Sequence, residues 1–370
     1  MTSAVHPMSR ALQLARSALG STSPNPSVGA VIVRESTVVG EGHTLPAGQH
    51  HAEIGALLQA GPAARGSTLY CTLEPCCHQG RTPPCTDVII NAGIARVIYA
   101  VRDPNPRVAG GGESALRAAG IALEHQPDPD AEELYEAFAK HITTGLPFVV
   151  AKFAMSLDGK IATRTGASQW ITGPQARARV QQMRKELDGI MVGIGTTLTD
   201  DPQLTARDPD GHPLPSDLQP VRIVVDSQGR TPTNARMLRE PGRTVIATGA
   251  NVDRSRISAL EEAGADVREF PGPDGRVQLS ALLRSLGDDG LVSVLVEGGG
   301  EVMGAMLDAG LIDKVHAFVA PKLIGGAGAS SPIGGNGATV MADVWNLDRA
   351  RSEQIGPDWL ITGYPTHGGD

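Results

Sequence analysis

The cysteines of this chain point to a metal site. All four lie between positions 71 and 85, around the segment TLEPCCHQGRTPPC, although the chain has 370 residues. In a reducing cytosol, clustered cysteines bind a metal or do chemistry more often than they form disulfides. Upstream, the segment HHAEIGALLQAG (50–61) adds a histidine that is followed two residues later by Glu53. These residue types at this spacing predict a zinc site.

Three side chains are predicted to hold the zinc, namely His51, Cys76 and Cys85. Three protein ligands leave the fourth tetrahedral position for water, as in catalytic sites, whereas structural zinc sites have four protein ligands. Zinc lowers the pKa of such a water toward neutrality. Glu53 is then placed to take the proton of the water and pass it to a leaving amine. The pattern H-x-E followed by P-C and a later cysteine is that of the zinc deaminases of bases and nucleosides.

The same segments predict the local structure. Apolar residues at helical spacing predict a helix that opens near His51. Cys85 begins a second helical run, CTDVIINAGI, whose N-terminus favours a thiolate. The insert QGRTPP (79–84) between the two cysteine ligands is rich in residues that form turns, which can loop the chain out and back.

Several neighbouring residues have alternative interpretations. His50 is a second candidate ligand, but His51 gives the H-x-E spacing. Cys71 lies in the apolar run STLYC and is expected to be a buried core thiol. Cys77 is expected to face away from the metal, and His78 is either a substrate contact or a solvated side chain.

The composition limits the classes of function. With 41% hydrophobic and 19% charged residues, 45 Gly and 27 Pro, the chain is globular, rich in turns and long enough for two domains. A net charge of −8 without a Lys/Arg block argues against a nucleic-acid partner. We find no apolar run long enough for a membrane span, and the N-terminal segment is typical of an ordinary helix. We expect a cytoplasmic protein that acts on small molecules.

The second half has a different pattern. From residue 148, short apolar strands alternate with helical stretches, which predicts an α/β fold with a largely parallel sheet. A helix gives way to Thr-Thr-Gly-Leu-Pro just before, which predicts two domains, 1–145 and 146–370.

Two turns of the second half are candidate cofactor contacts. The run Gly298-Gly299-Gly300-Glu301 follows a buried strand and opens a helix, so its backbone N–H groups form a phosphate site, unless it is a plain turn. Asp226 ends another strand and would favour NAD in a Rossmann fold. The glycines that follow GIMV (189–192) lack the third glycine of a dinucleotide fingerprint, which makes that signal weak. We do not predict a Rossmann fold, so the Asp226 signal carries little weight.

Four segments of the first half resemble the deaminase part of the bifunctional riboflavin-biosynthesis deaminase–reductases. They are SPNPSVGAVIV (23–33), HAE (51–53), TLEPCCHQGRTPPC (72–85) and DPNPRVAGGG (103–112). The resemblance implies a cytidine-deaminase-like three-layer α/β/α domain. It implies a phosphorylated pyrimidine substrate, a diaminopyrimidinone with a ribosylamino 5′-phosphate, contacted by Asn25 and Asn105. Two positions depart from the family pattern. Thr44 stands where the family has a histidine, which puts a substrate contact in question. Gly111 stands where the family has an arginine, which puts a contact with the substrate phosphate in question.

The second half resembles the reductase part of the same family, with matching segments in the same order. They are Lys152, SLDGK (156–160), SQWIT (168–172), TLTDDPQLTAR (197–207), DS (226–227) and EGGGEVMGAM (297–306). The resemblance implies a dihydrofolate-reductase-like α/β domain that uses NADPH to reduce the ribosyl group to ribityl. It implies cofactor contacts from Ala154, Trp170, Thr196, Asp200, Ser227, Gly299, Gly300, Glu301, Val302, Met303, Gly304 and Ala305. It implies substrate contacts from Ser168, Arg184, Leu204, Arg207 and Glu297.

Two of these residues have a second interpretation. Arg184 and Arg207 can each offer a bidentate fork to the substrate phosphate. Arg184 also lies among other basic residues on a predicted helix, so a solvated basic face is the alternative for it. For Trp170, the alternative is a place in the core.

The joint prediction is a bifunctional enzyme with one zinc per deaminase domain and NADPH in the reductase domain. One rival is a monofunctional zinc deaminase with a regulatory nucleotide-binding C-terminal domain. The other is a zinc-stabilised scaffold that binds a partner without catalysis. Because the reductase fold pairs through sheet edges, the resemblance also implies a homodimer or a homotetramer.

Overall fold

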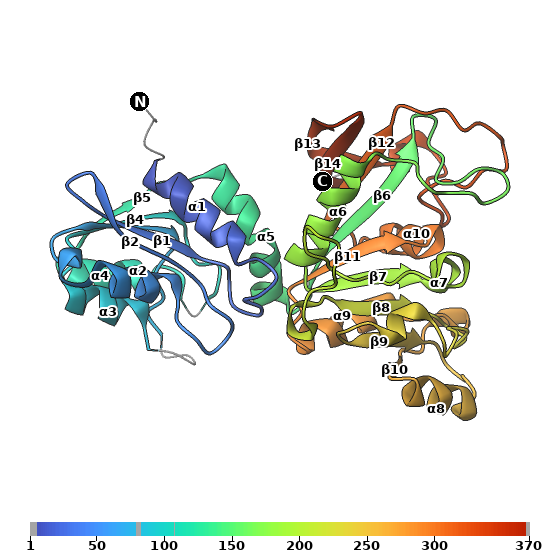
Figure 1. Cartoon of the computed structure of the whole chain (residues 1–370), viewed down its shortest axis with the longest axis horizontal. Helices are drawn as coiled ribbons and strands as arrows, with labels where there is room; N and C mark the ends of the chain where they lie inside the picture. The colour runs from blue at the N-terminus through green and yellow to red at the C-terminus, as the bar shows by residue number, and fades with distance from the viewer. Residues whose placement is uncertain (1–5, 79–82, 107, 368–370) are drawn as a thin grey trace. The chain divides into compact units, whose positions relative to one another are not determined.

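The computed structural model describes residues 6–78, 83–106 and 108–367. The chain divides into two compact units, Met1–Leu146 and Pro147–Asp370 (Figure 1). Part of the insert between Cys76 and Cys85, at positions 79–82, lies outside the described residues.

The described part of the first unit contains one five-stranded sheet with the order β2-β1-β3-β4-β5. Strand β1 is antiparallel to β2 and β3, whereas β3, β4 and β5 are parallel. The elements are α1 (Pro7–Ser17), β1 (Gly29–Arg34), β2 (Thr37–His43), α2 (Ala52–Ala60), β3 (Thr68–Leu73), α3 (Cys85–Ala92), β4 (Arg96–Val101), α4 (Gly111–Ala118), β5 (Ala122–His125) and α5 (Pro129–Thr144), with a 3-10 turn at Gly61–Ala64.

The first unit has three layers because alternate residues of its strands point to opposite faces of the sheet. Ala30 and Ile32 of β1 pack in a cluster with residues of α2 and α3, whereas Val31 between them packs with residues of α1. Helices α1 and α5 cover one face of the sheet, and α2, α3 and α4 cover the other (Figure 1).

The start of α2 lies tightly against the sheet. A Cβ atom at Gly42 of β2 would lie 2.2 Å from the carbonyl oxygen of Ala52, so only glycine permits this approach. The close approach fixes where α2 begins, and therefore where the preceding residue, His51, is held.

The described part of the second unit contains one nine-stranded sheet with the order β10-β9-β8-β7-β11-β6-β12-β14-β13. The strands are parallel from β10 to β12, and β14 and β13 complete the edge in antiparallel pairs. The elements are β6 (Phe148–Ser156), α6 (Pro174–Glu186), β7 (Gly189–Gly193), α7 (Ile194–Asp200), β8 (Val221–Val225), β9 (Thr244–Thr248), α8 (Arg254–Glu262), β10 (Asp266–Glu269), α9 (Leu279–Asp288), β11 (Ser293–Gly298), α10 (Gly300–Asp308), β12 (Lys314–Ala320), β13 (Trp345–Ile355) and β14 (Asp358–His367), with 3-10 turns at Ser216–Leu218, Arg236–Arg239, Pro273–Gly275 and Met341–Asp343.

The central parallel strands of this sheet are buried on both faces, as their unbroken apolar runs require. All residues of β7 and of β9 are buried. Because parallel strands end at the same edge, the segments after β7, β8 and β11 lie together, and ligands of α/β proteins bind at such edges. Across the described ranges, no helix is both long and apolar enough to cross a membrane.

Candidate active sites

His51, Cys76 and Cys85 come together in the first unit. His51 precedes α2, Cys76 follows β3, and Cys85 is the first residue of α3. One ligand atom from each of the three side chains lies within 4.8 Å of the other two. The backbone N–H of Cys85 also donates to the sulfur of Cys76 over 3.4 Å, which links the start of α3 to the segment after β3.

The spacing of these three side chains fits a zinc ion. With Zn–N near 2.0 Å and Zn–S near 2.3 Å, a tetrahedral zinc sets its nitrogen and sulfur ligands about 3.6 Å apart. His51 Nδ1 lies 3.2 Å from Cys85 Sγ and 3.6 Å from Cys76 Sγ. A hydrogen bond from Cys85, together with one from His51, lowers the pKa of the Cys76 thiol to about 4. Cys76 is therefore a thiolate at neutral pH, which is the form of sulfur that binds metal.

Glu53 lies beside this cluster in the first turn of α2 and is 4% exposed. Burial, together with the negative charge at Cys76, raises the pKa of its carboxyl to about 7. A carboxyl group with a pKa near the working pH can both accept and release a proton, as a general acid–base group must.

The alternatives around the zinc cluster can now be compared with the structure. His51, not His50, belongs to the cluster. Cys71 is fully buried in the core of the first unit, as expected. Thr44 is buried and its hydroxyl accepts a hydrogen bond from the backbone N–H of Val28, so it has a structural contact.

The second departure from the family pattern, Gly111, touches the metal-binding segment. A Cβ atom at Gly111 would lie 2.6 Å from Cys77 Sγ, so any larger residue there would displace that side chain. Asn25 lies in a turn closed by its N–H on the carbonyl of Thr22, and the N–H of Asn105 donates to the carboxylate of Asp103. Both asparagines are partly exposed.

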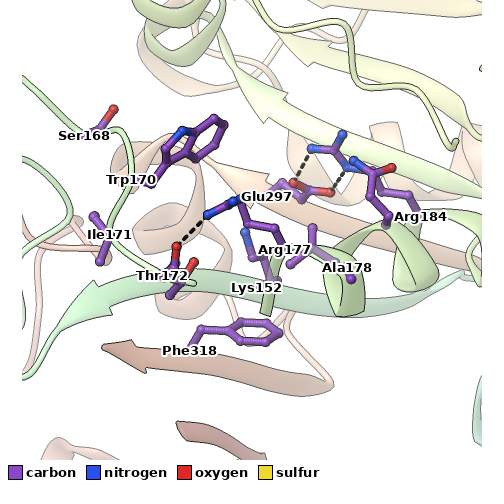
Figure 2. Close-up of a pocket in the computed structure, with 13 residues that line it drawn as sticks. Lys152, Ser168, Trp170, Ile171, Thr172, Arg177, Ala178, Arg184, Glu297 and Phe318 are labelled. Atoms are coloured by element: carbon purple, nitrogen blue, oxygen red, sulfur yellow. Dashed lines mark hydrogen bonds and ion pairs between the residues drawn. The ribbon is translucent and has the colours of Figure 1, made fainter. Parts of the chain in front are cut away.

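The second unit contains a cavity of about 510 Å³ next to β6 and α6 (Figure 2). Ser168, Arg184 and Glu297 of the predicted substrate residues line it, as do Ala154 and Trp170 of the predicted cofactor residues. Trp170 is 63% exposed, so the alternative that places it in the core is wrong. The guanidinium of Arg177 lies 4.6 Å from the centre of its ring.

Arg184 and Glu297 form a buried ion pair in this cavity. Arg184 Nε and Nη2 donate to the two carboxylate oxygens of Glu297 over 2.6 and 2.8 Å. The side chains are 17% and 6% exposed, so Arg184 does not belong to a solvated basic face. The guanidinium of Arg184, which was predicted to hold the substrate phosphate, is therefore already bound to the carboxylate of Glu297.

Lys152 is a third charge in the same cavity, where its side chain lies near Phe318 and Glu297 (Figure 2). Its ammonium is 5.9 Å from the centre of the Phe318 ring and makes no hydrogen bond or ion pair with another described residue. Burial lowers the pKa of Lys152, and the charge of Glu297 opposes this effect. The position of Lys152 matched the reductase pattern, but no local pattern indicated that its ammonium lies in a cavity.

A larger cavity of about 1160 Å³ lies at the carboxyl ends of β7, β8 and β11, and it shares Ser168 and Glu297 with the smaller one. Eight residues predicted to contact the cofactor line it. They are Thr196, Asp200, Ser227, Gly299, Gly300, Glu301, Val302 and Ala305.

The wall of this cavity suits a phosphate group. Gly299 has a φ of 84°, and a Cβ atom there would lie 3.1 Å from the backbone of Gly193. Helix α10 starts after it without a side-chain cap, so its first N–H groups are available to a ligand. The glycine turn at Gly299 and the uncapped start of α10 therefore suit the phosphate groups of a dinucleotide.

Four predicted site residues of the second unit line neither cavity. Met303 is buried, and a Cβ atom at Gly304 would lie 2.2 Å from the backbone of Gly334. Leu204 is 3% exposed and packs in a core cluster. Arg207 donates to the carbonyl of Gly211 and to the side chain of Gln203, so its guanidinium is engaged within the protein.

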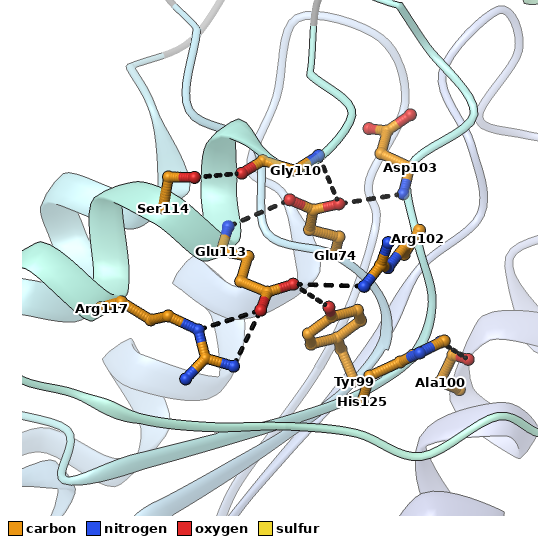
Figure 3. Close-up of polar contacts among 10 residues, drawn as sticks. All are labelled: Glu74, Tyr99, Ala100, Arg102, Asp103, Gly110, Glu113, Ser114, Arg117 and His125. Atoms are coloured by element: carbon orange, nitrogen blue, oxygen red, sulfur yellow. Dashed lines mark hydrogen bonds and ion pairs between the residues drawn. The ribbon is translucent and has the colours of Figure 1, made fainter.

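Sequence reasoning missed Glu74, whose carboxylate binds backbone N–H groups of Asp103, Gly110 and Glu113 (Figure 3). Its carboxylate is 2% exposed and accepts three backbone N–H bonds, from Asp103 at 3.3 Å, Gly110 at 3.2 Å and Glu113 at 3.0 Å. Because Glu74 precedes Cys76 by two residues, these bonds connect the ligand segment to the loop that carries Asn105. The quoted motif TLEPC contains this glutamate, but no local pattern indicates its distant partners.

Two family models match the chain. The cytidine and deoxycytidylate deaminase zinc-binding region matches residues 1–101, and the RibD C-terminal domain matches residues 147–361. The prediction of a cytidine-deaminase-like unit followed by a dihydrofolate-reductase-like unit is confirmed, as is the prediction of a zinc-binding deaminase joined to a reductase of the NADPH-using kind.

Known proteins resemble the chain along nearly its whole length. The riboflavin biosynthesis protein RibD of Actinobacillus pleuropneumoniae is 44% identical over 96% of this chain and 93% of its own, and that of Escherichia coli is 41% identical over 95% and 96%. The solved structure of Acinetobacter baumannii RibD is 37% identical, with a TM-score of 0.85 over 98% of both chains.

A Thermotoga maritima structure is 33% identical, with a TM-score of 0.82 over 97% of this chain and 98% of its own. It is described as a diaminohydroxyphosphoribosylaminopyrimidine deaminase/5-amino-6-(5-phosphoribosylamino)uracil reductase. Because these similarities span both units, a monofunctional deaminase with a regulatory second domain is not favoured. The chain belongs to the RibD family, the bifunctional deaminase–reductases of riboflavin biosynthesis.

Proposed function

We propose that the protein carries out two successive reactions of riboflavin biosynthesis. The first unit deaminates 2,5-diamino-6-(5-phosphoribosylamino)pyrimidin-4-one by hydrolysis, and the second reduces the ribosyl group of the product to ribityl with NADPH. The observation that carries the proposal is that His51, Cys76 and Cys85 meet beside the buried Glu53, in a chain whose other unit contains a cavity suited to a dinucleotide.

In the first unit, His51, Cys76 and Cys85 would hold the zinc. Bound zinc supplies a Lewis acid that brings the pKa of a water molecule near neutrality. Glu53 would accept a proton at its carboxylate and deliver it to the departing amine, because its pKa is raised to about 7 by burial and by the charge at Cys76. Asn25 and Asn105, which lie on loops of this unit, would orient the pyrimidine through hydrogen bonds.

In the second unit, the larger cavity would hold NADPH, which supplies a hydride when bound. The glycine turn at Gly299 and the start of α10 would contact its pyrophosphate. Thr196, Asp200 and Ser227 line the same cavity, and Ala154 and Trp170 line the adjoining one. Met303 and Gly304 would support the wall from behind rather than contact the cofactor.

The smaller cavity would hold the ribosyl group of the substrate. Ser168 and Glu297 line both cavities, so this is where the sugar and the cofactor would meet. Arg184 would orient Glu297 through their ion pair. Leu204 and Arg207 carry over from the family pattern, and their place outside both cavities limits them to an indirect role in this conformation.

Lys152 would supply the proton for the reduction. Reduction at C1′ adds a hydride to carbon, breaks the bond to the ring oxygen, and leaves that oxygen as a hydroxyl that needs a proton. The ammonium of Lys152 lines the cavity without a hydrogen-bond partner among the described residues, and burial lowers its pKa, which eases loss of the proton.

We propose that the second unit pairs with another copy through the edge of its sheet, as a homodimer or homotetramer. Edge strand β13 is exposed over nearly all of its length, and Leu347 and Trp359 add apolar surface nearby. Long exposed edges of this kind are usually paired or covered. The four cysteines form no disulfide, which supports a cytoplasmic location.

Withholding NADPH and then adding it tests the two proposed reactions separately. Purified protein given the diaminopyrimidinone substrate without NADPH should release ammonia and accumulate the ribosyl product. Addition of NADPH should then consume that product with oxidation of the nucleotide. Ammonia release that is never followed by NADPH oxidation would contradict the proposed second reaction, and NADPH oxidation without prior ammonia release would contradict the proposed order.

A further inference from the structure

Asp226 directly follows strand β8 but does not line the cofactor cavity. Its side chain is 0% exposed, and Oδ2 accepts hydrogen bonds from the backbone N–H and the hydroxyl of Thr231 over 2.6 and 2.7 Å. An acidic residue that reads the ribose hydroxyl of NAD must reach the ligand. Asp226 instead holds the turn 226–231 in place.

The same turn presents Arg230 to the cavity. On either side of it the backbone is fixed, because Arg256 Nε donates to the Gly229 carbonyl over 2.6 Å and the Thr231 N–H donates to Asp226 Oδ2 over 2.6 Å. The side chain of Arg230 is exposed and makes no hydrogen bond or ion pair with another described residue. A rigid backbone therefore carries a guanidinium whose donors are free for a ligand.

A second arginine lines the same end of the cavity. Arg276 lies in the short hairpin bridged by Pro271 and Val277, where its carbonyl accepts from Gly272 N–H over 2.8 Å. Val277 N–H donates to Ser227 Oγ over 3.2 Å, which ties the hairpin to the turn of Arg230. Like Arg230, Arg276 is exposed and has no side-chain partner within the described ranges.

These arginines lie away from the glycine turn. Strand β7 separates β8 from β11, so the end of β8 is roughly 10 Å from the turn at Gly299, at about 4.8 Å per strand. The nicotinamide end must reach Ser168 and Glu297, which border the smaller cavity on the opposite side. The adenosine half of the cofactor therefore extends toward β8.

We propose that Arg230 and Arg276 bind the 2′-phosphate of NADPH and select it over NADH. Guanidinium groups bind phosphate dianions through paired N–H donors, and NADH lacks this phosphate. Asp274 lines the same end, so the three charged side chains leave one net positive charge there. The inference rests on the proposed reductase function and names the residues that would set its cofactor preference.

Binding of NADPH and of NADH to the full-length protein, measured by nucleotide fluorescence without substrate, tests this inference. Arg230→Gln and Arg276→Gln should each weaken NADPH binding about tenfold, and the double variant more, because a hydrogen bond to a charged group contributes on the scale of one tenfold step. NADH binding should stay unchanged, which also reports that the variants are folded. Arg239→Gln, at an exposed arginine outside the cavity, should leave both affinities unchanged.

Each other result has a distinct meaning. A double variant that keeps the wild-type preference for NADPH would overturn the assignment of the two arginines. Equal losses for NADPH and NADH would also overturn it, since the arginines would then bind the shared pyrophosphate. A wild-type protein that binds neither nucleotide would overturn the proposed reductase function itself.

Discussion

Arg184 and Glu297 are 113 positions apart in the sequence and form a two-pronged ion pair inside the second unit, with N–O distances of 2.6 and 2.8 Å. Although burial opposes ionisation of Glu297, the charge of Arg184 keeps the pKa of Glu297 below its usual value. The pair joins helix α6 to the end of β11 at the point where the two cavities meet.

Loss of one partner of this pair should destabilise the second unit. Arg184→Met or Glu297→Met should lower the free energy of unfolding by about 3–5 kcal/mol, because the remaining buried charge loses its hydrogen-bonded partner. The double variant Arg184→Met/Glu297→Met should recover much of this loss. Denaturant titration of the full chain measures the effect, and single variants as stable as wild type would show that the pair is not needed for folding.

Lys152→Met should slow reduction strongly and leave deamination intact. Removal of a general acid typically costs about 100-fold or more in rate. NADPH should still bind, because Lys152 lines the smaller cavity rather than the larger one. Single-turnover oxidation of NADPH with the deaminated substrate measures the effect. A variant that reduces at the wild-type rate would exclude Lys152 as the proton donor.

The pH dependence of reduction should report Lys152 directly. An ammonium donor is active below its pKa, so the rate should fall as pH rises through that value. Because burial lowers the pKa of Lys152 from the ordinary 10.5, the fall should occur on the acidic side of 10.5. The residual activity of Lys152→Met should lack this alkaline limb. A wild-type rate that stays level up to pH 10.5 would contradict the prediction.

Glu74→Gln should raise the KM of deamination while the protein keeps its zinc. An amide presents one acceptor oxygen to three backbone N–H groups, so the loop from Asp103 to Gly110 should lose its anchor (Figure 3). Glu113→Gln is the matched control, because the Glu113 side chain contacts Tyr99 and Arg117 but none of those N–H groups. Steady-state kinetics and zinc content compare the two. Equal KM values in both variants would show that Glu74 does not position the loop.

Local patterns sufficed to predict the zinc cluster. The H-x-E spacing places Glu53 in the first turn of the helix that His51 precedes, Pro75-Cys76 lies shortly after the end of β3, and Cys85 begins α3. Burial of Cys71 also follows from its place in an apolar strand. These features depend on a few neighbouring residues, so the sequence carries them directly.

The second unit was harder to predict because its contacts are distant in sequence. The family pattern assigns the run from Gly299 to Ala305 as one block, but a helix repeats every 3.6 residues and presents only one side to a cavity. Val302 and Ala305 line the cavity, whereas Met303 and Gly304 face the protein. Likewise, only the folded chain shows that Arg184 is paired with Glu297 and that Asp226 is turned inward.

Elemental analysis of zinc tests the central claim most directly, applied to active wild-type protein, Glu53→Gln and Cys76→Ser. We predict about one zinc per chain in wild type and in Glu53→Gln, since three ligands and one open position define a catalytic site, and a clear deficit in Cys76→Ser. Of the two zinc-loaded proteins, only wild type should release ammonia. Wild-type protein that deaminates without zinc, or Cys76→Ser protein with a full zinc complement, would contradict the account.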